Sequence, residues 1–146
     1  MKSEPTTYGI DHLKKDKVTA WEGVRNYQAR NFMIKEMSVG DKVLIYHSNA
    51  EPSGVVGLAE VVSKAKPDKT ALDPKSQYYD AKASPEKPVW ECVDIKFVKK
   101  FEKLVPISAL RTNKKLSKML MLQTGSRLSI TPVTEAEYEE ICQMAV

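Results

Sequence analysis

The hydrophobic and polar positions repeat with a helical period in the N-terminal third of the chain. The segment 10–16 suits a short helix. A second helix is expected after Asn26, a residue type that caps helix N-termini well. Its apolar positions recur at helical spacing, which predicts that one face packs on the core. These positions are Ala29, Phe32, Met33 and Met37.

The middle of the chain changes to the period of a β-strand. Strands are predicted at 42–47, 55–63 and 89–101. Within the second of these, Gly57 indicates a bulge or the close approach of another group. In the third, side chains on alternate positions face opposite sides of the sheet. The expected apolar face holds Val93, Ile95 and Phe97, and the other face holds Trp90, Cys92 and Asp94.

Between the second and third strands, residues 64–88 form the longest irregular segment, and loops of this length are often functional. Residues 106–123 are expected to form one or two helices, and 127–133 a last strand. Thr134 and Glu137 have the spacing of a capping box, so a final helix is predicted from there to Met144. Helices flanking a strand-rich centre without regular βαβ alternation predict one α+β domain over residues 1–146.

Composition is that of an ordinary globular domain. The 146 residues are 42% hydrophobic and 29% charged, and no apolar run is long enough to cross a membrane. The first residues show no secretory signal. The two cysteines, Cys92 and Cys142, lie far apart and form no CxxC motif, so neither a disulfide nor a zinc site is expected. A cytoplasmic location and a monomeric state are the default expectations.

Charge is distributed unevenly along the chain. All 23 Lys and Arg residues lie in residues 1–130, whereas 131–146 hold four Glu and no basic residue. The basic body favours a polyanionic partner such as nucleic acid. The alternative interpretation is an ordinary solvated surface that ends in an acidic helix.

Several polar and aromatic residues are candidates for chemistry, but they form no catalytic pattern. Trp21 either fills the core or forms a pocket wall, and Arg25 and Arg30 could contact phosphate, stack on a planar ring or face solvent. His47 is expected to be structural, because Ser48 beside it on the strand points to the opposite face. No HExxH, GxSxG or Walker motif occurs, so no metal, cofactor or catalytic residue is predicted.

Motifs in order along the whole chain resemble the EVE domain, a family of the PUA-like superfamily. The resemblance rests on three motifs, KSEP at 2–5, WEGVRN at 21–26 and YHS at 46–48. Further matches are Ala29-Arg30, Gly40-Asp41, Tyr78-Tyr79-Asp80, Trp90, Arg127-Leu128-Ser129 and Pro132-Val133.

This resemblance implies a pseudo-barrel of mixed strands flanked by helices, with a pocket beside the first strand. Related YTH domains hold a methylated RNA base in an aromatic cage. By analogy, the chain would be a non-catalytic module that binds a modified nucleobase, notably modified cytosine, in DNA or RNA. The implied base pocket has Trp21 as a wall, Lys2 and Ser3 as its floor, Asn26 and Ser48 at the base edge, and Tyr79 as the opposing aromatic residue.

The energetics of base extrusion predict that stacking alone cannot provide selectivity. Stacking a base on an aromatic ring contributes about 1–3 kcal/mol, and extruding it from a duplex costs a few kcal/mol. Hydrogen bonds to the base edge and contacts to phosphate must supply the remainder. The expected phosphate contacts are Arg25, Lys82 and Arg127.

Two other functions remain open from the sequence. Related ASCH domains include small amidohydrolases that act on modified nucleosides, and a hydrolase of this kind would need Lys2 or Glu4 as base or nucleophile. The chain could also be a protein–protein adaptor whose pocket is vestigial.

Overall fold

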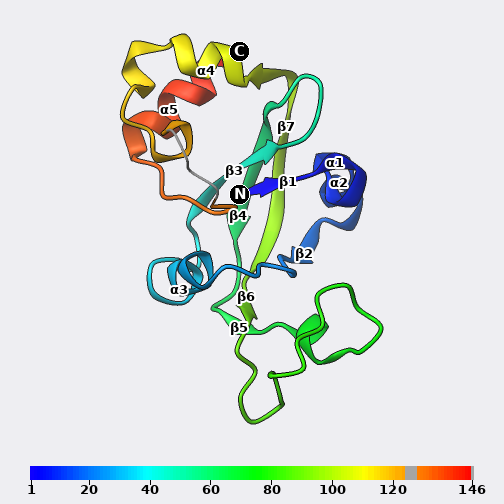
Figure 1. Cartoon of the computed structure of the whole chain (residues 1–146). Helices are drawn as coiled ribbons and strands as arrows, with labels where there is room; N and C mark the ends of the chain where they lie inside the picture. Colours follow the sequence, from blue (N-terminus) through cyan, green and yellow to red (C-terminus); the bar gives the residue numbers. More distant parts are fainter. Residues whose placement is uncertain (124–127, 146) are drawn as a thin grey trace.

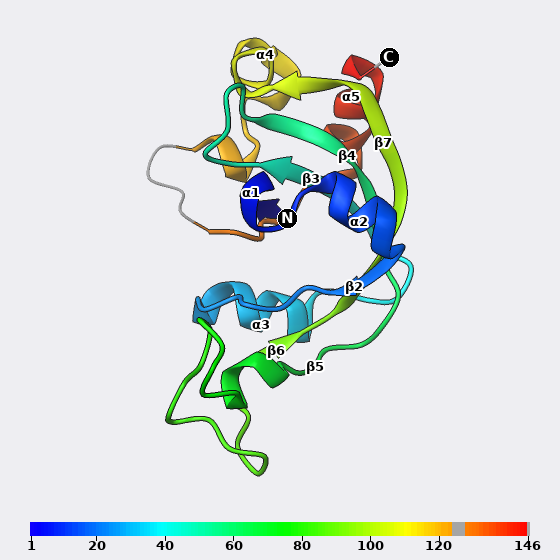
Figure 2. The ribbon, with the colours of Figure 1, turned by 90° about the vertical axis from the view of Figure 1, so that its right-hand side faces the viewer.

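A five-stranded mixed sheet forms the centre of the protein, with strand order β1-β3-β4-β7-β2. The computed structural model describes residues 1–123 and 128–145. β1 runs parallel to β3, and the other neighbouring strands are antiparallel. The sheet curls into a half-barrel (Figure 2). Its strands are β1 (Lys2–Ser3), β2 (Val18–Ala20), β3 (Lys42–His47), β4 (Gly54–Val61) and β7 (Asp94–Pro106).

Helices lie at both ends of this sheet, and together they confirm the predicted α+β class (Figure 1). The helices α1 and α2 lie beside β1, α3 lies near the opposite end, and α4 and α5 lie together at the top of Figure 1. Their bounds are α1 Pro5–Tyr8, α2 Ile10–Asp16, α3 Tyr27–Lys35, α4 Ile107–Thr112 and α5 Glu135–Met144, with 3-10 turns η1 Lys69–Leu72, η2 Lys114–Leu116 and η3 Leu120–Leu122.

The predicted helix after Asn26 is confirmed as α3. The side-chain oxygen of Asn26 accepts a hydrogen bond from the backbone N–H of Ala29 at 3.0 Å, as an N-cap does. Ala29 and Met33 are buried, and Phe32 and Met37 pack against the same core cluster. The apolar face therefore anchors α3, and its polar N-terminus is free to lie at the surface.

The predicted strand 89–101 divides into two strands at Val93. β6 (Glu91–Cys92) pairs with β5 (Lys66–Pro67) in a separate two-stranded sheet, and β7 extends five residues further than expected, to Pro106. Val93 and Ile95 are fully buried as predicted, but Cys92 and Trp90 are buried as well. Trp90 is covered by Tyr27, whose ring stacks on it, and by Asp80, which accepts a hydrogen bond from its Nε1.

The structure explains Gly57 as a point of close approach. The pairing of β4 with β7 shifts register between Val55 and Gly57, which is the expected irregularity. A Cβ atom on Gly57 would lie 2.4 Å from the carbonyl oxygen of Lys99 and 2.9 Å from Cδ1 of Ile10. Both contacts are too close for any other residue, so β7 and α2 require glycine here.

The C-terminal region differs from the prediction in one element. α4, η2 and η3 occupy the expected helical region 106–123, and the capping box of Thr134 and Glu137 begins α5. The predicted strand 127–133 is wrong over its described part, because residues 128–133 form no strand. The carbonyl of Ser129 accepts a hydrogen bond from the Lys2 N–H at 2.8 Å, but Pro132 has no N–H to continue a ladder.

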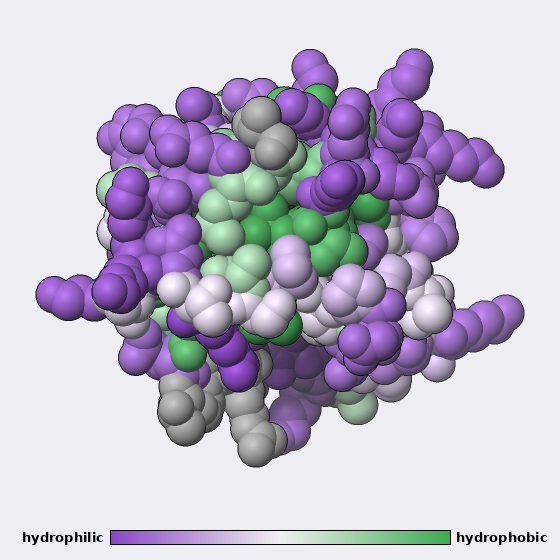
Figure 3. Space-filling view, turned by 90° about the horizontal axis from the view of Figure 1, so that it is seen from above, coloured by the Kyte–Doolittle hydropathy of each residue, from purple (hydrophilic) through white to green (hydrophobic). Residues whose placement is uncertain are grey.

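Figure 3 shows the molecule from above, relative to the view of Figure 1. This face is mostly hydrophilic and has an apolar area at its centre. Within the described residues, no helix is both long and apolar enough to cross a membrane.

Replacing Gly57 with alanine is expected to destabilise the protein by about 1–3 kcal/mol, since the added methyl group forces β7 or α2 to move. Urea unfolding followed by circular dichroism measures the change. Glu102→Ala, at an exposed position on β7, is the control and should change stability by less than about 0.5 kcal/mol. Equal unfolding midpoints for Gly57→Ala and wild type would contradict this account of the packing.

Candidate functional site

A cavity of about 720 Å³ opens beside β1, and we call it the Trp21 pocket. It brings together β1, α1, the end of β2, the segment 21–25, Ser48 and part of the long 64–90 segment. Its lining residues are Lys2, Ser3, Glu4, Thr7, Tyr8, Thr19, Ala20, Trp21, Glu22, Gly23, Val24, Arg25, Ser48, Gln77, Tyr78, Leu128 and Ser129. Four residues predicted for the base pocket are therefore in one cavity: Lys2, Ser3, Trp21 and Ser48.

The floor of the Trp21 pocket is held by backbone hydrogen bonds on both sides of β1. The Ser48 N–H donates to the carbonyl of Ser3 at 2.9 Å, and the Lys2 N–H donates to the carbonyl of Ser129 at 2.8 Å. The side-chain Oγ of Ser3 is buried, and it has no hydrogen-bond partner among the described residues. Buried hydroxyl groups are nearly always paired, so this one is available to a ligand or a water molecule.

Trp21 combines the two roles that the sequence left open. Its side chain is only 8% exposed and belongs to the core cluster, yet it also lines the pocket. The backbone N–H of Trp21 donates to the carbonyl of Val93 at 2.9 Å. The ring of Tyr8 meets the indole ring edge-on, with 6.2 Å between the two ring centroids. The indole is therefore a rigid wall, fixed from behind by the core.

A buried carboxylate, that of Asp68, organises the part of the lining formed by Gly23, Arg25 and Tyr78. Asp68 is fully buried, and its Oδ2 accepts hydrogen bonds from the Gly23 N–H at 2.9 Å and from Nη1 of Arg25 at 3.0 Å. Its Oδ1 accepts from the N–H and hydroxyl of Thr70. Burial alone would raise the pKa of Asp68, but these hydrogen bonds outweigh burial and the pKa lies below its ordinary value.

All N–H groups of the Arg25 guanidinium have partners within the protein, and the phosphate contact expected of Arg25 stays a prediction. Nε and Nη2 both donate to the carbonyl of Tyr78, at 3.0 and 2.8 Å. Nη1 donates to Asp68 and to the Val24 carbonyl, and the second N–H of Nη2 donates to the hydroxyl of Thr70. Because a guanidinium has five N–H groups, these bonds pair all of them. Arg25 thereby joins the pocket to the long 64–90 segment.

Tyr78, rather than the predicted Tyr79, lies in the lining of the pocket. A Cβ atom on Gly23 would lie within 2.6 Å of the Tyr78 ring, and Gly23 has φ +87°, so glycine is required there for two reasons. Arg25 lies over the other part of this ring, 5.5 Å from its centroid. The adjacent Tyr79 is 46% exposed and lies outside the lining.

Two other predicted residues, Asn26 and Lys82, are also outside the pocket lining. Asn26 is exposed and uses its side-chain oxygen to cap α3. Lys82 is exposed in the long segment, where its N–H donates to Asp80. Arg127 lies outside the described residues. Arg30 takes the stacking role considered for it, with its guanidinium over the rings of Tyr27 and Trp90.

The histidines act as hydrogen-bond acceptors for the backbone. Nε2 of His47 accepts from the Ile10 N–H at 3.0 Å, and Nδ1 of His12 accepts from the Gly9 N–H at 2.8 Å. Burial lowers the pKa of His47, which keeps the ring neutral. His47 is therefore structural, as predicted, and is not placed to activate Ser48. Among residues 1–123 and 128–145, no three His, Cys, Asp or Glu side chains are grouped to hold a metal.

Sequence analysis did not identify Tyr8 or Asp68, and of the two adjacent tyrosines Tyr78 lines the cavity while Tyr79 does not. The only local signal at Asp68 is its cap of η1, where it accepts from the Thr70 N–H. Its partners Gly23 and Arg25 lie 45 and 43 residues away, so no short-range pattern could reveal the pairing.

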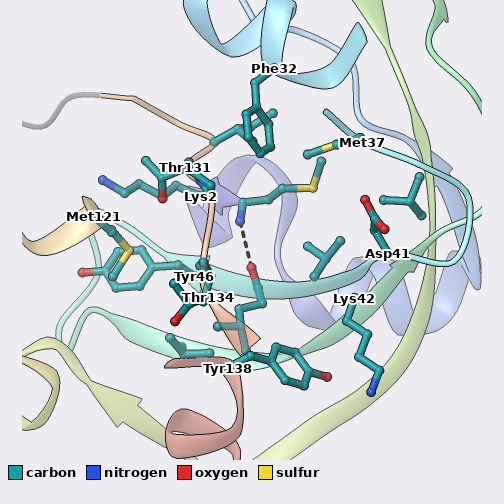
Figure 4. A pocket seen from close by; sticks show the side chains of 18 of the residues that line it. Lys2, Phe32, Met37, Asp41, Lys42, Tyr46, Met121, Thr131, Thr134 and Tyr138 are labelled. Atoms are coloured by element: carbon teal, nitrogen blue, oxygen red, sulfur yellow. Dashed lines mark hydrogen bonds between the residues drawn. The ribbon is translucent and has the colours of Figure 1, made fainter. Parts of the chain in front are cut away.

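A second cavity, of about 530 Å³, adjoins β1 and also includes Lys2 (Figure 4). It is rich in apolar side chains, including Met37, Leu44 and Met121. A backbone hydrogen bond from Met1 N to the Leu44 carbonyl, 2.8 Å long, crosses it. In Figure 4 the side chains of Lys2 and Tyr46 extend to the same side, next to Met121.

Comparison with known proteins shows a match over nearly the whole chain. The EVE domain model matches residues 1–144. A solved structure of a hypothetical protein from Leishmania major is 50% identical, with a TM-score of 0.95 over 99% of this chain and 91% of that one. A structure of human THYN1 protein in complex with 5-methylcytosine containing DNA is 34% identical, with a TM-score of 0.91 over 99% and 95%.

Thymocyte nuclear protein 1 of Gallus gallus is 36% identical over 162 residues, which include 99% of this chain and 66% of that protein. The chain thus spans about two thirds of this relative's length. These similarities agree with the mixed half-barrel seen here.

Replacing Asp68 with alanine is expected to destabilise the protein by about 3 kcal/mol or more, because Arg25 loses its buried partner. Urea unfolding measures the loss. Asp73→Ala is the control, because Asp73 is exposed and its side chain caps only a local turn through the Lys75 N–H. A loss no larger than that of the control would show that Asp68 does not organise this part of the lining.

The depressed pKa of Asp68 also predicts how stability changes with pH. A carboxyl whose pKa is lower in the folded than in the unfolded state stabilises the fold above the unfolded value, and this contribution is lost as pH falls. The wild-type protein should therefore lose stability as the pH falls below about 3.8, the ordinary pKa of an aspartate side chain. Asp68→Asn should lose less over the same range, as measured by urea unfolding at each pH. Parallel pH profiles would contradict the assignment.

Proposed function

The chain belongs to the EVE domain family, and from that premise we propose that it binds a modified nucleobase without catalysing a reaction. The first candidate is 5-methylcytosine in DNA, because the human relative is described in complex with DNA that contains this base. RNA with the same modification is the second candidate. A cytoplasmic location and a monomeric state stay predictions.

The observation that carries this proposal is the combination of a rigid aromatic wall with an unpaired buried hydroxyl in one cavity. Trp21 provides the wall, and Tyr8 and Tyr78 add aromatic edges to the lining. Ser3 provides a hydroxyl that can donate to or accept from a base edge. The volume of about 720 Å³ lies in the range of small-molecule sites and leaves room for a base with its sugar.

The Arg25–Asp68 pair supports the proposal because it holds the pocket open before any ligand binds. The pair fixes the Gly23 backbone on one side and the Tyr78 backbone on the other. A site that needs no rearrangement loses less free energy on binding. This matters for an extruded base, because stacking and the cost of extrusion nearly cancel.

A hydrolase is the alternative function, and two observations keep it in view. Lys2 and Glu4 both line the pocket, and burial lowers the pKa of Lys2 toward the range where an amine can act as a base. Against this, Oε1 of Glu4 accepts a hydrogen bond from Nδ2 of Asn49 at 2.7 Å. Because the Glu4 carboxylate is engaged by Asn49, the contacts in the pocket favour binding of a base over catalysis.

Titration of short oligonucleotides at fixed salt tests the proposal. The panel contains cytosine, 5-methylcytosine, 5-hydroxymethylcytosine and N6-methyladenine, each in DNA and RNA. We expect at least tenfold tighter binding to one modified base, about 1.4 kcal/mol, and loss of this preference in Trp21→Ala. Because Trp21 is also a core residue, Ser3→Ala and Tyr78→Ala are measured beside it, with circular dichroism to verify folding.

Tyr79→Ala is the matched control, since its side chain is exposed and outside the lining. It should bind like wild type, whereas Tyr78→Ala should bind more weakly. Uniform, salt-sensitive binding to every oligonucleotide would contradict base recognition. Turnover of an acylated nucleoside that disappears in Lys2→Ala or Glu4→Ala would establish the hydrolase function. If no oligonucleotide binds and Trp21→Ala only lowers stability, the protein–protein adaptor becomes the remaining function.

A further inference from the structure

A third cavity, of about 500 Å³, lies beside the Trp21 pocket, and we call it the Lys2–Arg111 cavity. The two cavities share Lys2 and Ser48, so they meet at the junction of β1 with the end of β3. Arg111, from the last turn of α4, is part of the far wall. The remaining lining residues are Tyr46, Asn49, Ser53, Ile107, Met121, Leu122 and Gln123.

The charged residues that line this cavity are both cations. They are Lys2 and Arg111, and among residues 1–123 and 128–145 no carboxylate is in the lining. The Ser48 hydroxyl and the second amide N–H of Asn49 are neutral groups that can donate hydrogen bonds. The first N–H of Asn49 donates to the carboxylate of Glu4, next to the cavity. The Ser53 hydroxyl and the Gln123 amide donate to backbone carbonyls. Two cations with two neutral donors match an anion with several oxygen atoms.

Both cations line the cavity together with the buried ring of Tyr46. Nζ of Lys2 lies 6.0 Å from the ring centroid, and both side chains extend to the same side in Figure 4. Tyr46 and Arg111 both line the cavity, and burial raises the pKa of Tyr46 while the charge of Arg111 opposes this increase. In the described part of the chain, neither Lys2 nor Arg111 forms an ion pair.

We propose that the Lys2–Arg111 cavity binds a backbone phosphate of the nucleic acid whose modified base enters the Trp21 pocket. This inference rests on the proposed function, because it assigns the cavity to the same ligand. A base and a phosphate next to it are joined through one sugar, and two cavities that share Lys2 and Ser48 can hold both groups at once. The guanidinium donors of Arg25 are all paired within the protein, whereas Lys2 and Arg111 form no ion pair among the described residues.

The Lys2–Arg111 cavity should contribute to the affinity for nucleic acid but not to the selectivity for the modified base. Phosphate contacts position a nucleic acid but carry no information about the base. Arg111→Gln should therefore weaken binding to methylated and unmethylated DNA by the same factor, about three- to tenfold, and leave their ratio unchanged. It should also reduce the slope of log affinity against log salt by about one.

A neutral methylphosphonate linkage in the DNA tests the contact itself. The probes are single-stranded DNA oligonucleotides with one 5-methylcytosine and one methylphosphonate, placed in turn at each linkage near that base. Wild type should lose affinity when one particular linkage is neutral, and Arg111→Gln should be insensitive to that same linkage. Lys114→Gln, exposed and three residues along the chain, is the control for net charge and should keep the wild-type sensitivity.

The outcomes distinguish failure of this inference from failure of the proposed function. If wild type prefers methylated DNA but Arg111→Gln retains full sensitivity to every linkage, the phosphate site is wrong and base recognition stands. If Arg111→Gln and Lys114→Gln reduce affinity equally, the effect is one of overall charge, and the inference is again overturned. If wild type shows no preference for the modified base, the proposed function has failed first.

Discussion

The carboxylate of Asp68 is the constraint on which the Trp21 pocket depends. It is buried without exposure to solvent, so each of its oxygen atoms needs donors, and it obtains them from Gly23, Arg25 and Thr70. Arg25 in turn uses two of its donors on the Tyr78 carbonyl, which fixes the long 64–90 segment against the pocket. One buried charge therefore joins the segment 21–25 to the segment 64–90, which are distant in sequence. The segment 64–90 has little regular structure of its own, and this network holds it in place.

The arrangement of β1 connects this fixed wall with the surface that we assign to phosphate. β1 has only two residues, but it pairs in parallel with β3 and is bonded to Ser129 on its other side. Consecutive side chains on a strand point to opposite faces. The hydroxyl of Ser3 is accordingly buried at the Trp21 pocket, while the side chain of Lys2 extends beside Tyr46. The fold thus presents a neutral hydrogen-bonding group to one cavity and a cation to the next, as a base and its phosphate would require.

Elements with strong periodicity and local caps could be predicted from the sequence, and contacts between distant segments could not. The helix capped by Asn26, the strand 42–47, the close approach at Gly57 and the capping box at Thr134 all follow from neighbouring residues, and the structure has each of them. The extra length of β7 and the absence of a strand at 128–133 depend on pairing partners elsewhere in the chain. For the same reason, Trp21 and Ser3 could be placed in a pocket by motif, but the internal role of Arg25 required the position of Asp68. The position of Tyr78 in the lining depends on its contact with the backbone of Gly23, far earlier in the chain, which no local pattern reveals.

The central claim is that a modified base lies against Trp21 inside a pocket that Asp68 holds in place. The most direct measurement is an NMR experiment on the complex with single-stranded DNA that carries a ¹³C-labelled methyl group on one 5-methylcytosine. The account predicts nuclear Overhauser contacts from this methyl group to the side chains of Trp21, Tyr8 or Tyr78, which line the same cavity. Contacts only to residues outside the lining, or a methyl group that remains as mobile as in free DNA at saturation, would contradict it.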